Sequence, residues 1–148
     1  MYNYLKNIGI IARCTDMYRD DYFRDTGLNG RQCVCLMHIC KQPGITQDAL
    51  SKTLFIDKSN VTRQMSMLEE TGYITRCPSE DDRRQIRVFP TEKAEKQLPA
   101  IREGFRSWRE FLNETLTEEE QKLLAETADK LAKKAALRCN RIVTEEQT

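Results

Sequence analysis

Hydrophobic side chains recur at steps of three and four residues in the N-terminal stretch and again in the last third of the chain. This spacing is typical of α-helices that bury one face. The first helix is predicted from Asn3 to about Tyr22, and its inner positions are mostly apolar: Leu5, Ile8, Ala12, Thr15, Tyr18 and Tyr22. A longer helix is predicted after Thr91, and its inner face comprises Ala94, Leu98, Ile101, Phe105, Trp108 and Leu112.

The helix after Thr91 and the C-terminal helix carry further local signals. Thr91 is expected to cap the first of them, and Pro99 should kink or break it, because proline lacks an amide donor. The sequence from Thr117 to Glu120 is a capping box, in which each of these two side chains accepts from the other residue's backbone amide. The last helix is predicted to run to about Arg141 through Leu123, Leu124, Thr127, Leu131 and Ala135.

The centre of the chain contains shorter predicted helices, followed by two predicted strands. Residues 31–41 contain the run CVCLMHIC, which is apolar nearly all round and predicts a buried helix. Thr46 is expected to cap a helix that reaches about Leu54, and Asp57 a second helix that ends at Gly72. Two short strands at 73–76 and 85–89 flank the turn-prone sequence PSEDD and predict a β-hairpin. The fold class is therefore mainly α with a small β-hairpin, in an order typical of DNA-binding modules.

Composition fits a single globular domain of 148 residues, with 39% hydrophobic and 32% charged residues. No apolar run approaches the ~18–20 residues of a membrane span. No cleavage site follows the short apolar patch at the N-terminus, so we expect a cytoplasmic protein without a signal peptide. The net charge is +1, and residues 46–91 hold seven basic and seven acidic side chains, a balance of zero. Any affinity for nucleic acid must therefore depend on where these charges point.

The helix after Asp57 has an outer face that suits a DNA groove. Its inner stripe consists of Val61, Met65 and Leu68. The residues outside this stripe are small, polar or basic, and are Lys58, Ser59, Asn60, Thr62, Arg63 and Ser66. Small hydroxyls let a helix lie deep in the major groove, where Asn can read adenine and Arg can read guanine or bind a phosphate. The alternative is an ordinary solvated face, but such faces favour Glu and Lys, and this one has no acid before Glu69.

The hairpin tip carries Arg83 and Arg84 directly after three acidic residues. An arginine at such a tip can enter a narrow minor groove, where the negative potential is strongest. Asp82 can hold the guanidinium of Arg84 in position before DNA arrives. A solvated charged turn is the alternative interpretation. Arg87, on the second strand, completes the set of candidate DNA contacts.

Three segments, ITQDALSKTL, DKSNVTRQMSMLEETGYITR and DDRRQIRVFPTEKA, resemble the MarR (multiple-antibiotic-resistance regulator) family of winged helix-turn-helix transcription factors. Asp82 and Arg84 match the family's Asp-x-Arg wing element. Thr91 matches the Thr of its Leu-Thr-x-x-Gly helix start, whereas Pro90 and Ala94 stand in place of that Leu and Gly. The resemblance implies a homodimeric repressor on a palindromic double-stranded DNA operator, and a response to small aromatic acids or oxidants.

The same resemblance divides the single domain, residues 1–148, into a DNA-binding lobe at about 29–91 and dimerisation helices at 1–26 and 92–148. The long apolar faces of these helices agree with a dimer, since one small lobe cannot cover them. An effector pocket would lie between the lobe and the dimerisation helices, lined by residues such as Tyr18, Tyr22, Met37 and Phe105. A packed core is the alternative at that position.

None of the six cysteines has the paired spacing of a zinc site. The chain is too helical for a small disulfide scaffold, so the thiols are expected to stay reduced. Cys35 and His38 share a helix face and together could take a soft metal. Core packing is the favoured interpretation of this helix, and neither a metal nor a cofactor is predicted. Cys14 and Cys77, each of which follows an arginine, are the candidate redox thiols.

The sequence does not predict an enzyme. His38 is the only histidine and lies in an apolar run, and no phosphate loop or set of paired carboxylates is visible. The rival to a DNA-binding regulator is a dimeric helical adaptor that binds proteins and not DNA. An adaptor would explain the balanced charge and the long apolar faces, but not Asn60, Arg63 and the arginine-tipped hairpin.

Overall fold

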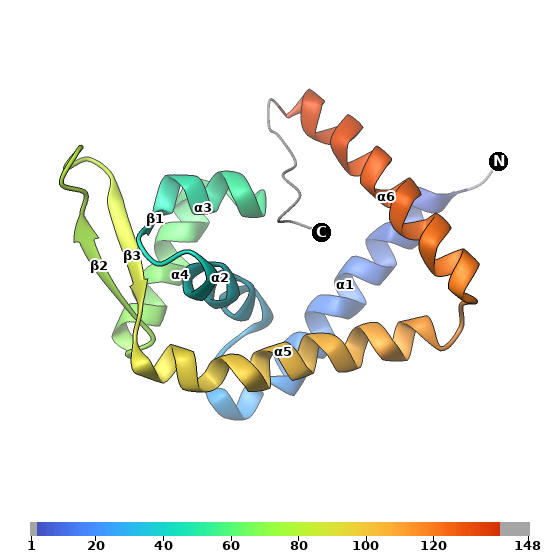
Figure 1. The fold of residues 1–148 in the computed structure, drawn as a ribbon, viewed down its shortest axis with the longest axis horizontal. Helices are drawn as coiled ribbons and strands as arrows, with labels where there is room; N and C mark the ends of the chain where they lie inside the picture. The colour runs from blue at the N-terminus through green and yellow to red at the C-terminus, as the bar shows by residue number, and fades with distance from the viewer. Residues whose placement is uncertain (1–2, 140–148) are drawn as a thin grey trace.

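The computed structural model describes residues 3–139 of the chain. It is mainly helical and contains one small antiparallel sheet, which confirms the predicted fold class (Figure 1). In chain order the elements are α1 (Tyr4–Tyr22), the 3₁₀ turn η1 (Arg24–Thr26), α2 (Gly30–Lys41), β1 (Ile45–Thr46), α3 (Gln47–Leu54), α4 (Lys58–Glu70), β2 (Ile74–Pro78), β3 (Ile86–Pro90), α5 (Glu92–Asn113) and α6 (Glu118–Arg138).

Three helices, α3, α4 and α6, begin at side-chain caps that the sequence predicted. The Thr46 hydroxyl accepts from the backbone amide of Ala49 at 3.0 Å, which starts α3. The Asp57 carboxylate accepts from the amide of Asn60 at 2.8 Å, which starts α4. Thr117 and Glu120 form the expected capping box at the start of α6. These caps satisfy amides that have no partner within the first helical turn.

The sheet differs from the prediction in two ways. It has three strands in the order β1-β3-β2, because the two-residue strand β1 pairs antiparallel with β3, Ile45 opposite Val88. A strand of two residues is too short to show a period in the sequence. Both hairpin strands begin one residue later than predicted. The Tyr73 amide donates to the Leu68 carbonyl at 2.8 Å and so belongs to the end of α4, and the Gln85 amide donates to the Asp82 carbonyl at 2.9 Å and so belongs to the turn.

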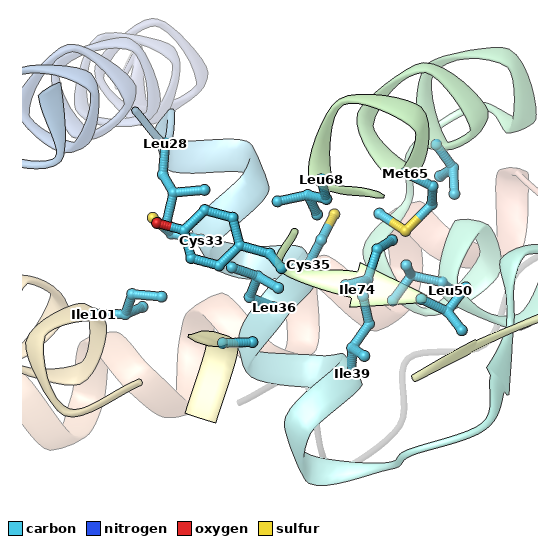
Figure 2. Packing of buried hydrophobic residues seen from close by; sticks show 14 of the residues in the cluster. Leu28, Cys33, Cys35, Leu36, Ile39, Leu50, Met65, Leu68, Ile74 and Ile101 are labelled. Atoms are coloured by element: carbon cyan, nitrogen blue, oxygen red, sulfur yellow. The ribbon is translucent and has the colours of Figure 1, made fainter. Parts of the chain in front are cut away.

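One core joins the winged lobe to the flanking helices. Side chains of α2, α3, α4 and the sheet converge in it, as Figure 2 shows for Leu36, Leu50 and Met65. Ile101 of α5 belongs to the same cluster and is fully buried. Phe23, which directly follows α1, also belongs to it. Helix α5 and the C-terminal end of α1 are therefore anchored on the lobe, and a movement of α5 would disturb the packing of its core.

Helix α5 departs from two sequence expectations. It runs through Pro99, so the predicted break is not present. Pro99 is exposed, and so is Glu95, whose carbonyl loses a helical donor there and can be solvated instead. Thr91 precedes the helix, but its hydroxyl makes no capping bond; it donates to the Gly72 carbonyl at 2.6 Å and thereby ties α5 to the end of α4. At the C-terminus, the predicted helix end near Arg141 lies outside the described residues.

Candidate nucleic-acid interface

The orientation of α4 is determined by its buried face. Val61, Met65 and Leu68 are all at most 1% exposed and pack into the core. Residues at other positions of the helix must therefore face outward, as the sequence pattern predicted. The turn before α4 is fixed by Phe55, which has a left-handed φ of 55°, and by the Ser51 hydroxyl, which donates to the Ile56 carbonyl at 2.6 Å. Helices α3 and α4 thus form a helix-turn-helix.

The candidate DNA contacts on α4 all lie on its solvent side. Ser66 and Asn60 are half-buried, and the remaining four, Lys58, Ser59, Thr62 and Arg63, are exposed. The Thr62 hydroxyl donates to the Lys58 carbonyl at 2.9 Å, and the Ser66 hydroxyl to the Thr62 carbonyl at 3.1 Å. These bonds fold both side chains against the helix. At these two positions the side chains project little from α4, so its backbone can come close to a partner.

Asn60 is held by neighbours on the same helix. Its side-chain oxygen lies 3.3 Å from Nη2 of Arg63 and 3.3 Å from Nε2 of Gln64, both of which donate to it. Gln64 is 5% exposed, so the amide of Asn60 is braced from the core side. This arrangement orients an Asn and an Arg together on the outer face of α4.

The β2–β3 turn carries Arg83 and Arg84 at its tip, and both are exposed. The side chain of Arg84 is 92% exposed, but its orientation is restrained by Asp82. Asp82 accepts from the Arg84 backbone amide at 3.1 Å and from its Nε at 3.2 Å. The expected pairing of Asp82 with Arg84 is therefore present in the structure.

Arg87 differs from the other candidates because its guanidinium is already engaged. Nε donates to the Ser79 hydroxyl at 3.1 Å, Nη1 donates to the Gly44 carbonyl at 3.0 Å, and Nη2 lies 3.5 Å from Asp81. Ser79 is buried at 3% exposure. Arg87 thus joins the base of the wing to the loop between α2 and β1, which the sequence alone did not indicate.

Another arginine, Arg76, was not among the predicted contacts, and it connects the wing to α4. Arg76 of β2 donates through Nε and Nη2 to Glu69 of α4, at 3.0 and 2.7 Å. These hydrogen bonds are the main cause of a lowered pKa at Glu69. Nη1 of Arg76 reaches the side chain of Gln47 on α3 at 3.4 Å. One guanidinium therefore holds the wing, α4 and α3 in a common arrangement.

A cleft of about 400 Å³ lies between α4 and the wing. Asp48 forms ion pairs with Lys52 at 3.0 Å and with Lys58 across the turn. The pairing of Asp48 with Lys52 can be expected from the sequence, because the two residues are four positions apart on one helix. The contact of Asp48 with Lys58 depends on how α3 and α4 pack against each other. The residues that line the cleft are Gln47, Asp48, Lys58, Thr62, Arg84, Gln85 and Ile86.

The cysteines separate into two groups. Cys33 and Cys35 are fully buried in the core, as the packing interpretation expected, and burial raises the pKa of each thiol to about 12. Cys14 and Cys77 are exposed. Within residues 3–139, no group of three or more Cys, His, Asp or Glu side chains is arranged to hold a metal ion. In the same part of the chain, no helix is long and apolar enough to cross a membrane.

A helix-turn-helix followed by an arginine-tipped wing defines a winged helix-turn-helix protein. The sequence model of the MarR family matches residues 26–85, and a relative supports that match over most of the chain. The helix-turn-helix transcriptional regulator YybA of Bacillus subtilis is 33% identical over 126 residues, which cover 84% of each chain. The chain belongs to the MarR family.

Solved structures agree with this assignment. A MarR protein from Peptoclostridium difficile has a TM-score of 0.88 and 26% identity, and the match covers 90% of this chain and 88% of that one. A MarR-family transcriptional regulator from Listeria monocytogenes, solved with a 26mer DNA, has a TM-score of 0.83 and 29% identity, with 89% and 88% covered. The protein is therefore a MarR-family transcriptional regulator, and the regulators it resembles are not enzymes.

Proposed function

We propose that a homodimer of this chain binds a palindromic duplex operator and represses transcription, with α4 in the major groove and the wing in the minor groove. The observation that carries the proposal is that Lys58 of α4 and Arg84 of the wing line the same cleft. Both are exposed, with 73% and 92% of their side chains accessible. A duplex lying along this face would meet a helix and an arginine that are already oriented toward it.

We assign different roles to the candidate residues. Asn60 and Arg63 face outward together and are suited to reading base edges, while Lys58 and Arg83 are suited to phosphates. The small hydroxyls of Ser59, Thr62 and Ser66 allow close approach and add polar contacts to the backbone. Arg84 enters the minor groove and Asp82 keeps its guanidinium extended. For Arg87 we propose a positioning role at the base of the wing, because its three donor nitrogens are in use.

The proposed dimer rests on apolar side chains that the single chain leaves in solvent. On α1, Leu5 is 69% exposed, and on α6, Leu123 and Leu124 are 64% and 58% exposed. Exposed apolar area of this kind is what a second copy can bury. In Figure 1, α5 leads away from the winged lobe, and α1 and α6 lie on the side of the molecule away from the sheet. A two-fold dimer through them would present two copies of α4 to one operator.

The proposed division of the chain follows from this arrangement. Residues 29–91 make the DNA-binding lobe, and residues 1–26 and 92–148 contribute to dimerisation. The protein would act in the cytoplasm, where bacterial DNA is accessible. A small ligand or an oxidant could release the operator. For an oxidant, the exposed Cys14 and Cys77 are the proposed targets, since the raised pKa values of Cys33 and Cys35 disfavour their thiolates.

The test is duplex binding at several salt concentrations, with Arg84→Ala compared against wild type. Loss of one groove contact should weaken binding about tenfold and reduce the slope of log affinity against log salt by about one. Arg24→Ala is the matched control, because Arg24 is also an exposed arginine with one aspartate partner, Asp21 at 2.6 Å, and lies in η1 outside the proposed interface. It should bind as wild type does.

Two outcomes would contradict the proposal. Wild-type protein that shows no salt-dependent binding to any duplex would leave the dimeric adaptor as the better function. Equal losses in Arg84→Ala and Arg24→Ala would mean that overall charge, and not the wing, governs binding. Selection from randomised duplexes then tests the symmetry of the site, since a dimer should enrich a palindrome.

A further inference from the structure

Asp48 is an acidic residue in the middle of the surface proposed to bind DNA. It lies in the first turn of α3, and its two oxygens are divided between two lysines. One oxygen pairs with Lys52, one turn later on the same helix, at 3.0 Å. The other pairs with Lys58, the first residue of α4. The carboxylate therefore joins the two helices of the helix-turn-helix through their basic side chains.

The electrostatic environment keeps this carboxylate ionised. Hydrogen bonds from Lys58 and then Lys52 lower the pKa of Asp48. Its side chain is 32% exposed, whereas the side chains of Lys52 and Lys58 are 69% and 73% exposed. The lysines are thus accessible to an incoming anion, and Asp48 lies beneath them.

Asp48 lies in the first turn of α3, a position that would attract a DNA phosphate if no acidic side chain were there. Exposed amides and the helix dipole make the first turn of a helix attractive to anions. At the start of α3 the Thr46 hydroxyl accepts from the Ala49 amide, and Asp48 already places a negative charge in the first turn. A DNA phosphate approaching the cleft would compete with Asp48 for Lys52 and Lys58 and would also meet the negative charge of Asp48.

We propose that Asp48 is an internal counter-ion that competes with DNA phosphates for Lys52 and Lys58 and so limits the sequence-independent affinity of the protein. The inference rests on the proposed DNA-binding function and concerns the backbone component of that binding. Phosphate contacts supply nearly all of the affinity for arbitrary duplex. Base contacts through Asn60 and Arg63 do not involve Asp48, so the counter-ion acts on the component that carries no sequence information.

The proposal predicts a gain in binding when the counter-ion is removed. Asp48→Asn leaves both lysines free to neutralise phosphates. Binding to a random-sequence duplex at fixed salt should tighten about three- to tenfold, the range expected for release of two exposed ion pairs. The slope of log affinity against log salt should become steeper by about one to two, since each added phosphate contact contributes about 0.9.

Asp129→Asn is a closely matched control. Asp129 is 31% exposed and pairs with Lys133, four residues later on α6, at 2.8 Å. The substitution removes the same unit of charge from an i,i+4 pair outside the helix-turn-helix. It should leave the salt slope unchanged. Sedimentation of each variant at the assay concentration, together with circular dichroism, checks that assembly and folding are the same.

Two further variants test the mechanism itself. Asp48→Glu keeps the charge and should retain the wild-type slope. Adding Lys58→Met to Asp48→Asn should remove much of the gain. An unchanged slope in Asp48→Asn, or an equally steep one in Asp129→Asn or Asp48→Glu, overturns the inference. If wild type binds duplex and Arg84→Ala weakens that binding, such a result leaves the proposed function in place; if wild type does not bind, both fail.

Discussion

Gly104 offers a sharp test of how α5 packs on the lobe. It is buried in the interior of α5, where helix propensity alone favours Ala over Gly by about 1 kcal/mol. The structure predicts the opposite sign for Gly104→Ala. A Cβ at this position would lie 2.6 Å from Cζ of Phe23, and 2.7 and 2.8 Å from two ring carbons of Tyr22.

The magnitude follows from these three contacts. Carbon atoms pack favourably at about 3.5–4.0 Å, so the added methyl overlaps each ring carbon by roughly 1 Å. Tyr22 is 43% exposed and can shift, but Phe23 is 1% exposed and held in the core. Overpacking of a rigid core costs about 1–3 kcal/mol, and three simultaneous contacts favour the upper part of that range. After subtraction of the propensity gain of about 1 kcal/mol, Gly104→Ala should lower the free energy of unfolding by about 1–2 kcal/mol.

The assay is urea unfolding followed by circular dichroism, with all variants at one protomer concentration because dimerisation would shift the midpoint. Ala100→Gly is the control, since Ala100 is an exposed position one turn earlier in the same helix. It measures the propensity contribution directly and should cost about 1 kcal/mol. If Gly104→Ala raises the free energy of unfolding by a similar amount, the close approach of α5 to Phe23 and Tyr22 is wrong.

Two further predictions concern charge and assembly. Because the folded-state pKa of Glu69 is held below its ordinary value of 4.5, first of all by Arg76, the pair stabilises the fold above that pH and loses this contribution as the pH falls below it. Glu69→Gln should therefore lower the urea midpoint near pH 7 but have little effect near about pH 3, and an equal loss at both would contradict this. The chain should sediment as a dimer at micromolar concentration, and Leu124→Glu should raise the dissociation constant more than tenfold, since burial of each Leu contributes about 1.5–3 kcal/mol. A stable wild-type monomer, or an equal effect of Lys122→Glu, would oppose the proposed dimer.

Local features of the fold were predictable because their causes lie within a few residues. Thr46, Asp57 and Thr117 begin helices through hydrogen bonds that span three positions, and the residue types at those positions are visible in the sequence. The pairing of Asp82 with Arg84 spans two positions and was predicted for the same reason. Strand β1 was missed because it exists only by pairing with β3, more than forty residues later.

The candidate site shows the same division. The sequence by itself determined which face of α4 is polar, since the apolar period of Val61, Met65 and Leu68 leaves only one outer face. Tertiary structure decided what the charged residues on and around that face do. Arg87 became a brace of the wing because Gly44 and Ser79 lie beside it, and Asp48 became a counter-ion of Lys58 because α3 and α4 cross at that point. A periodic pattern records the burial of a helix, whereas the partner of a long charged side chain depends on which segments the fold brings within a few ångströms of it.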